Sequence, residues 1–255
     1  NTLRKHIKIE PEQFYYDCDR LGMFVLQDMV NNGGYSYIFD TVLPTFGFKK
    51  RNDCKGRYQE PERKVIFEQH MKDTLHDLYN HPCIIGYTIF NEGWGQFDAD
   101  GVYEVLKRID STRVFDSTSG WFNETKSDVD SEHVYFKKIK IKKNTDRPIV
   151  LSEFGGYSCK IKDHSFNLSK TYGYAKCKNE EELFKALQRL YLEQILPAVE
   201  KGLCASVLTQ LSDIEDETNG IVTYDRRHIK TNPEKMQRIA KAILDKFKEI
   251  TEGEA

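Results

Sequence analysis

The sequence lacks the charge imbalance and the long apolar runs that mark two large classes of protein. Its 255 residues carry 38 Lys and Arg against 40 Asp and Glu, which gives a formal net charge of −2 at pH 7. A nucleic-acid-binding domain usually has a strong basic excess, so we expect no nucleic-acid partner. No apolar run approaches the roughly 18 residues that span a membrane, so we expect no membrane partner either.

The six cysteines are too widely spaced to form a familiar metal or redox motif. No two of them stand in a C-x-x-C arrangement, and a chain of this length can build its core without disulfides. We therefore expect reduced, mostly buried thiols, a cytoplasmic location, and neither a metal nor another cofactor. The cysteines are Cys18, Cys54, Cys83, Cys159, Cys177 and Cys204.

A glycine-rich phosphate loop such as G-x-G-x-x-G is also missing after every predicted strand. Apolar, β-prone runs alternate with helical patterns, which predicts βαβ units and a parallel sheet. The predicted strands cover residues 2–6, 23–29, 83–91, 113–119, 133–136, 149–154 and 204–211. The predicted helices cover residues 12–20, 62–79, 101–109, 180–201 and 233–250, and residues 30–60 and 155–178 read as long loops.

Two parallel architectures fit this order of elements: a doubly wound open sheet and an eight-stranded (β/α)8 barrel. The missing phosphate loop weakens the nucleotide-binding form of the open sheet. Several strands end on polar or charged residues, which favours the barrel, because barrel enzymes build their active sites at the carboxyl ends of the strands. The fold class that we predict is therefore α/β, a TIM barrel.

Two glutamates stand where apolar strands stop abruptly. Glu92 follows the run 84–90 and precedes Gly93-Trp94-Gly95, and Glu153 follows Val150-Leu151-Ser152 and precedes two glycines. One such residue alone is usually a solvated loop carboxylate. Two carboxylates at the mouth of one barrel are what glycoside hydrolysis requires, since one protonates the leaving oxygen while the other attacks the anomeric carbon or activates water.

Four motifs in order resemble one family of enzymes. They read NTLRKHIKIEPEQFYYDCDRLGMFVLQDM, FNEGWGQ, LSEFGG and TQLSDIEDETNGIVTYDRR. Together they resemble the catalytic barrel of glycoside hydrolase family 2, which includes β-galactosidases, β-glucuronidases and β-mannosidases. The resemblance covers the chain from Asn1 to about Lys230 and implies a retaining, double-displacement glycosidase.

The resemblance also implies catalytic and substrate-binding roles. Glu92 matches the general acid/base and Glu153 the nucleophile. Like charges in one pocket disfavour double ionisation, so we expect Glu92 to hold the proton while Glu153 stays ionised. The positions that match substrate-side or supporting residues are Arg4, His6, Asn91 and Tyr135; for Arg4, His6 and Tyr135 the alternative is a purely structural hydrogen-bonding role.

Three further residues are candidates for sugar contact. Trp94 and Trp121 would stack on a pyranose, or else pack at the barrel rim. Many relatives have an aromatic residue after the last barrel strand, where this chain has Gln210, which would instead bond a hydroxyl. The acidic run Asp213, Glu215, Asp216 and Glu217 is a conceivable metal site, although a solvated loop that meets sugar hydroxyls fits better.

The substrate that we expect is a terminal, neutral β-linked hexoside or oligosaccharide, and a β-galactoside first. Family β-glucuronidases bind the sugar carboxylate through an Asn-x-Lys signature, and the chain reads Glu217-Thr218-Asn219-Gly220 in its place. β-Mannosidase, β-glucosidase and β-glucuronidase activities are the alternatives within the family. An inactive carbohydrate-binding relative is the alternative outside catalysis.

The resemblance begins inside what would be the second strand of the barrel. We therefore expect residues 1–255 to be a C-terminal catalytic barrel domain, a fragment of a larger multidomain enzyme that here lacks its first strand and helix. An incomplete parallel barrel exposes unpaired strand edges, which favour association. A homo-oligomer is accordingly a possible partner state.

Overall fold

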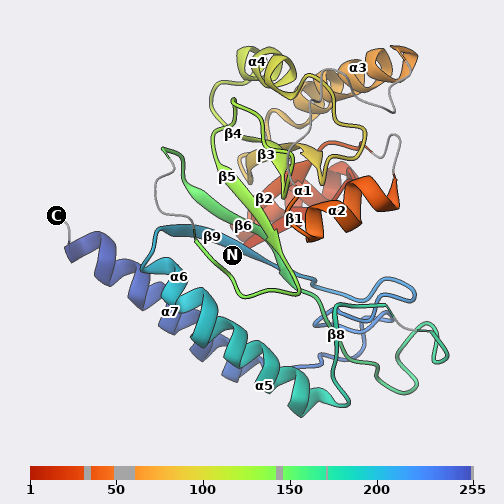
Figure 1. The fold of residues 1–255 in the computed structure, drawn as a ribbon, viewed down its shortest axis with the longest axis vertical. Coiled ribbons are helices and arrows are strands. Elements are labelled where there is room, and N and C mark those ends of the chain that lie inside the picture. Colours follow the sequence, from red (N-terminus) through yellow and green to blue (C-terminus); the bar gives the residue numbers. More distant parts are fainter. Residues whose placement is uncertain (32–35, 49–60, 142–145, 171, 254–255) are drawn as a thin grey trace. The chain divides into compact units, whose positions relative to one another are not determined.

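The computed structural model describes residues 1–31, 36–48, 61–141, 146–170 and 172–253 (Figure 1). It divides the chain into two compact units, Asn1–Glu132 and His133–Ala255. Among the described residues, no helix combines the length and the apolar character needed to cross a membrane.

The first unit is built on a four-stranded parallel sheet in the order β1-β2-β3-β4. The strands are β1 (Thr2–Lys5), β2 (Phe24–Asp28), β3 (Ile84–Asn91) and β4 (Val114–Ser119). All three ladders are parallel, so the carboxyl ends of the four strands lie at one edge of this sheet. These are the first four predicted strands, and each lies within two residues of its expected bounds.

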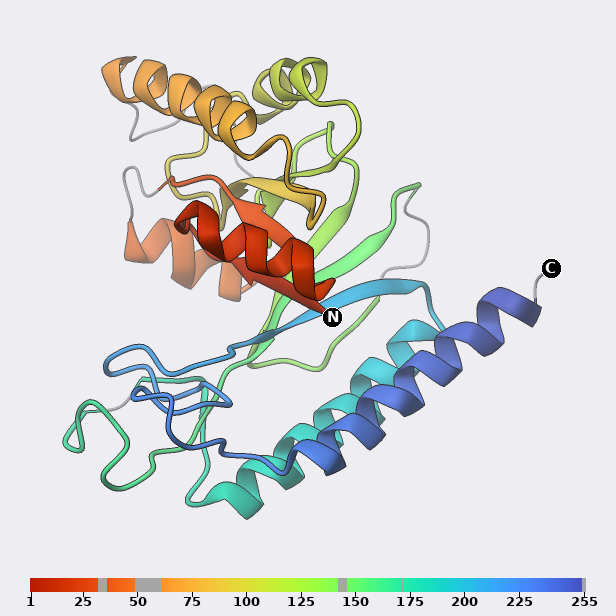
Figure 2. The ribbon, with the colours of Figure 1, turned by 180° about the vertical axis from the view of Figure 1, so that it is seen from behind.

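Helices cross over between these strands, as parallel pairing requires. They are α1 (Glu12–Leu21), α3 (Pro61–Leu78) and α4 (Ala99–Ile109), and α3 and α4 lie side by side (Figures 1 and 2). Helix α1 ends at Gly22, whose φ of 67° gives the left-handed C-cap that glycine adopts without steric cost. The strand residues Ile84, Phe90 and Phe115 and the helix residue Leu106 are buried in one apolar core.

Two local predictions for the first unit are wrong. The loop predicted over residues 30–60 contains a short helical segment, η1 (Tyr37–Val42) followed by α2 (Leu43–Thr45), while residues 32–35 and 49–60 lie outside the described chain. In α3 the apolar stripe was expected to include Val65 and Ile66, which are 67% and 68% exposed. The buried face instead starts at Phe67, which lies one helical turn before Met71.

The remaining long strands form a three-stranded sheet in the order β5-β6-β9. They are β5 (Asp130–Val134), which straddles the boundary between the units, β6 (Ile149–Gly155) and β9 (Leu203–Thr209). Strands β6 and β9 pair in parallel. The predicted strand over 133–136 is displaced by two to three residues, so Tyr135 follows β5 and does not lie on it.

A long helical rod covers this sheet and packs beside the last helix. It consists of α5 (Glu180–Leu190), η3 (Tyr191–Ile195) and α6 (Leu196–Val199), and α7 (Pro233–Gly253) runs alongside it (Figure 2). Asn179 caps α5 by accepting a hydrogen bond from the Glu182 N–H at 2.9 Å. The wider π-helical turn of η3 ends two residues before Pro197, which lacks the N–H that a regular helix needs at that position.

The predicted loop over 155–178 contains a small parallel ladder that was not expected. Strand β7 (Tyr157–Ser158) pairs with β8 (Ala175–Lys176). Two-residue strands carry no detectable alternation of apolar and polar residues, so sequence patterns do not reveal them. The ladder fixes the chain that directly follows Glu153.

An ion pair between Lys230 and Asp213 is buried in the second unit. The Lys230 ammonium lies 2.7 Å from Asp213 Oδ1, and the two side chains are 0% and 1% exposed. Lys230 also donates to the carbonyl oxygens of Cys159 and Thr218, at 2.7 and 3.0 Å. The expectation of a solvated acidic loop is therefore wrong for Asp213, because its carboxylate joins three segments of the chain through one ammonium group.

Replacing Lys230 should destabilise the protein strongly. Lys230→Met leaves the Asp213 carboxylate buried without its cation, which costs about 3–5 kcal/mol in free energy of unfolding. The control, Lys241→Met, removes a lysine that is 73% exposed and paired with Asp245 on the same helix, and should cost no more than about 0.5 kcal/mol. Urea unfolding curves measure both. Equal losses for the two variants would contradict a structural role for the buried pair.

Candidate active site

Glu92 sits on a turn that takes it out of the regular geometry of β3. Its φ is 52° and that of Gly93 is 75°, both in the left-handed region. The Glu92 N–H still donates to the Ser119 carbonyl at 2.9 Å, and the Trp94 N–H closes the turn on the Asn91 carbonyl at 2.9 Å. A left-handed glutamate is uncommon, so this turn is held by its neighbours and not by the residue's own preference.

Arg4, Asp28 and Asn91 form a buried polar cluster at the carboxyl ends of three adjacent strands. Arg4 donates twice to Asp28, through Nε and Nη2 at 2.9 Å each, and once to Asn91 Oδ1 at 2.8 Å. The Arg4 and Asp28 side chains are 3% and 1% exposed. This bidentate pair fixes the guanidinium plane, and Arg4 in turn orients the Asn91 amide.

His6 and the two tryptophans lie close to this cluster. His6 Nε2 is 3.2 Å from Asn91 Nδ2, and its ring stands edge-on to Trp94 at 6.3 Å between centroids. Trp121 donates from its indole N–H to the Glu92 carbonyl at 3.1 Å and is 8% exposed. The first unit thus brings six predicted residues together: Arg4, His6, Asn91, Glu92, Trp94 and Trp121.

Glu153 lies at an irregularity near the end of β6. The β6–β9 ladder pairs Leu151 with Ser206 and Phe154 with Leu208, with a register shift between, so that Ser152 and Glu153 together face one residue of β9. Such a β-bulge turns a side chain away from the direction that strand alternation would give it. Here it determines where the Glu153 carboxylate points.

Two side chains of the second unit contact this carboxylate, and Thr209 contacts one of them. The Tyr135 hydroxyl donates to Glu153 Oε2 and lies 3.1 Å from Thr209 Oγ1. His133 Nδ1 is 3.4 Å from the same Glu153 oxygen, and the His133 side chain is fully buried. Burial and, after it, the nearby Glu153 charge raise the pKa of the Tyr135 phenol well above its ordinary value, so Tyr135 stays protonated and donates at neutral pH.

Gln210, which follows β9, is held in a small polar cluster. Its Nε2 donates to Asn219 Oδ1 at 2.7 Å and lies 3.2 Å from Glu217 Oε2. Asn219 is 4% exposed, and its Nδ2 has no hydrogen-bond partner within the described structure. This amide–carboxylate cluster is suited to hydroxyl groups, which both donate and accept.

Four residues near the candidate carboxylates were not predicted. Asp28 ends strand β2, so the pattern that singled out Glu92, a charged residue at the carboxyl end of an apolar strand, also predicts a site role for Asp28. The other three have no comparable signal in the sequence, because a buried histidine, a strand-end threonine and a loop tyrosine are common everywhere. These three are His133, Thr209 and Tyr174.

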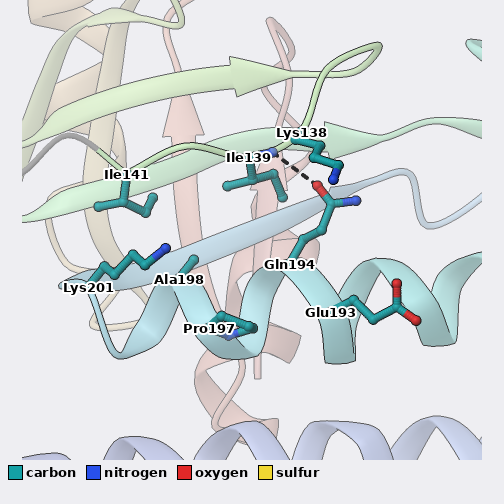
Figure 3. Close-up of a pocket in the computed structure, with 8 residues that line it drawn as sticks. All are labelled: Lys138, Ile139, Ile141, Glu193, Gln194, Pro197, Ala198 and Lys201. Atoms are coloured by element: carbon teal, nitrogen blue, oxygen red, sulfur yellow. Dashed lines mark hydrogen bonds between the residues drawn. The ribbon is translucent and has the colours of Figure 1, made fainter.

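A small cavity of the second unit lies apart from these residues. It has a volume of about 100 Å³ and separates residues 138–141 from the helical rod (Figure 3). The Ile139 N–H donates to Gln194 Oε1 across it at 3.0 Å. None of the predicted site residues lines this cavity.

The five described cysteines are free thiols, three of them buried, and Cys54 lies outside the described residues.

Comparison with known proteins identifies the family. The family model described as "Glycosyl hydrolases family 2, TIM barrel domain" matches residues 9–241. A comparison with curated proteins gives no match.

Solved structures with the same fold include three uronidases. The β-D-glucuronidase of Dictyoglomus thermophilum aligns with a TM-score of 0.62 and 13% identity, over 96% of this chain and 44% of that one. A family 2 β-galacturonidase from Eisenbergiella tayi, bound to galacturonate, aligns with a TM-score of 0.58 and 17% identity, over 97% and 44%. β-Glucuronidase 2 of Bacteroides uniformis aligns with a TM-score of 0.58 and 18% identity, over 89% of this chain and 29% of that one.

At these identities the structural likeness shows the fold alone, and the chain spans 29% to 44% of the length of these three proteins. The parallel α/β fold agrees with the sequence prediction of a TIM-barrel architecture. The family match extends over most of the sequence. The chain belongs to glycoside hydrolase family 2 and carries its TIM-barrel domain.

Proposed function

We propose that the protein is a retaining glycoside hydrolase that acts on terminal, neutral β-linked hexosides, with β-galactosides as the preferred class. The observation that carries the proposal is the Glu153 carboxylate, placed by a β-bulge and bonded by the Tyr135 hydroxyl, in a family 2 barrel. A carboxylate that accepts a hydrogen bond from a protonated phenol is held in one orientation, as a nucleophile must be.

Glu153 acts as the nucleophile in this proposal. Its carboxylate attacks the anomeric carbon and forms a glycosyl ester, while Glu92 protonates the departing oxygen. Glu92 then takes a proton from water as the water attacks the ester, which releases the sugar and restores both side chains. Tyr135 keeps its proton throughout and orients the Glu153 carboxylate.

The remaining predicted residues bind the sugar or support the residues that do. Asn91, oriented by Arg4, presents an amide to a sugar hydroxyl, with His6 beside it. Trp94 lies next to the Glu92 turn and presents its ring to the sugar, the buried Trp121 supports that turn through its bond to the Glu92 carbonyl, and Gln210 belongs to the amide–carboxylate cluster. No metal and no organic cofactor enters these steps.

The preference for a neutral sugar rests on two charged groups at or near residues 213–220, the Lys230 ammonium and the Glu217 carboxylate. An ammonium has three N–H donors, and those of Lys230 have the acceptors Asp213 Oδ1 and the carbonyls of Cys159 and Thr218. Lys230 therefore has no donor left for a sugar carboxylate. Glu217, bonded to Gln210, adds a negative charge where a uronate would be repelled.

Substrate class is tested with 4-nitrophenyl glycosides and the full-length protein. The panel contains the β-galactoside, β-mannoside, β-glucoside, β-glucuronide and β-galacturonide. We expect the galactoside to give the highest kcat/KM and the two uronides the lowest. Faster hydrolysis of a uronide would overturn the neutral preference. No hydrolysis of any member would favour a carbohydrate-binding protein without turnover.

Replacing the two glutamates should separate their roles. Glu153→Gln should lower kcat by several orders of magnitude on every substrate, because no ester forms. Glu92→Gln should lower kcat/KM, which reports formation of the ester, by roughly 10²–10⁴-fold on glycosides with alkyl leaving groups and far less on nitrophenyl glycosides, which depart without protonation. The exposed Glu193→Gln serves as a control and should leave both rates unchanged. Near-normal activity of Glu153→Gln contradicts the assignment.

The configuration of the first product tests the double displacement independently. Two inversions at the anomeric carbon give net retention, so the β-anomer should appear first. Proton NMR during the first minutes of hydrolysis, before mutarotation, distinguishes the anomers. An α-anomer that forms first would require an inverting reaction and would exclude a glycosyl ester on Glu153.

A further inference from the structure

Four aromatic side chains extend outward from Glu153 in the second unit. The rings of Tyr135 and Tyr174 are stacked, with centroids 3.8 Å apart and planes at 10°. Phe136 and Tyr172 stand edge-on to Tyr174, at 5.0 and 6.0 Å between centroids. We call Tyr135, Phe136, Tyr172 and Tyr174 the aromatic platform. They come from two separate segments, so the ladder β7–β8 and not sequence proximity brings them together.

Two glycines make this stack possible. Gly156 has a φ of 68°, and a Cβ at this position would come within 2.3 Å of Tyr174 Cδ2. At Gly173 a Cβ would lie 2.5 Å from Ser158 Cβ. The Tyr174 N–H donates to the Gly156 carbonyl at 2.9 Å, so the ring of Tyr174 lies directly over a residue without a side chain. This close approach is a physical reason for a glycine at the second position of the pair that follows Glu153.

The outer rings of the platform are not part of the core. Phe136 and Tyr172 are 67% and 54% exposed. Neither belongs to an apolar cluster of the second unit within the described residues. An exposed group of aromatic rings that is ordered by glycines and a β-ladder is more informative than a single exposed apolar residue, because such patches mark binding sites.

The platform connects the candidate nucleophile to the polar cluster. At one end the Tyr135 hydroxyl bonds Glu153. At the other end Tyr172 forms a parallel bridge with Glu217, and the Thr218 N–H donates to the Tyr172 carbonyl at 3.3 Å. Ring faces bordered by carboxylate and amide groups suit a ligand with an apolar face and a rim of hydroxyls, which describes a pyranose.

We infer that the aromatic platform binds a second pyranose ring of the substrate, so that the preferred substrate is an oligosaccharide and not a glycoside with a small aglycone. This inference rests on the proposed function, since Glu153 defines where the reacting sugar binds. A protein partner would require a much larger apolar surface than four rings. The occupant is therefore part of the substrate, held next to the sugar that Glu153 attacks.

The test compares two substrates of the same terminal sugar, the one that the nitrophenyl panel selects. A β-linked disaccharide has a second ring, and a glycosyl fluoride has none. Phe136→Ala and Tyr172→Ala should each lower kcat/KM on the disaccharide by about 3- to 10-fold, mainly through KM, because each removes one ring contact. Both variants should keep the wild-type kcat/KM on the fluoride. Phe166→Ala is the control: it is 56% exposed, contacts Tyr224 and lies outside the platform.

Each other outcome contradicts the platform. Equal losses on both substrates would mean that the rings only support Glu153, and no loss on either would mean that nothing binds there. The proposed function fails separately, if Glu153→Gln hydrolyses the glycosyl fluoride as fast as the wild type does. If the platform variants contradict the inference but Glu153→Gln is inactive, the glycosidase assignment still stands.

A pair of glycine variants tests the same inference through the stack. Gly156→Ala displaces Tyr174 from Tyr135 and should lower kcat/KM more on the disaccharide than on the fluoride, with a change in the near-ultraviolet circular dichroism of the tyrosines. Gly202→Ala places a Cβ at a φ of 100° with nothing within 4 Å, so it carries backbone strain without a clash. It should lower Tm while leaving the ratio of the two kcat/KM values unchanged. A changed ratio in Gly202→Ala, or an unchanged one in Gly156→Ala, would overturn the inference.

Discussion

A carboxylate that leaves water must be matched by a donor aimed at it, and this requirement organises both units. Asp28 receives two bonds from Arg4, Glu153 receives the Tyr135 hydroxyl, and Asp213 receives the Lys230 ammonium. Burial of an unmatched charge would cost several kcal/mol, so each donor fixes the position of the segment that carries it. The paired charged groups therefore connect strands and loops that are distant in the sequence.

These carboxylates differ in how far their side chains are exposed to solvent. Asp213 is fully buried with its cation and joins segments of the chain. The Glu153 side chain keeps 13% exposure while one oxygen is bonded by Tyr135. A partly open carboxylate with one fixed oxygen can react without losing its orientation. An acidic residue that follows a strand is thus a structural contact at Asp213 and a candidate nucleophile at Glu153.

The sequence predicts the strands well because burial on both faces leaves long apolar runs, as in residues 84–90. It also predicts that Glu92 and Glu153 lie where strands stop being regular. The donors are harder to find, since Lys230 is 17 residues from Asp213 and Asp213 belongs to a run that reads as solvated. The ladder β7–β8 and the stack of Tyr174 on Tyr135 depend on close approach at Gly156, which no periodicity reports.

Irregular backbone places both candidate catalytic glutamates at the ends of their strands. On a regular strand, side chains alternate between two faces, and no residue is aimed along the strand towards a ligand. Glu92 leaves that pattern through a left-handed turn and Glu153 through a bulge. The glycines Gly93 and Gly156, both at positive φ, follow within three residues of these glutamates. The left-handed turn at Glu92 is stabilised by backbone hydrogen bonds to Ser119 and Asn91, and the Glu153 carboxylate is oriented by the Tyr135 hydroxyl.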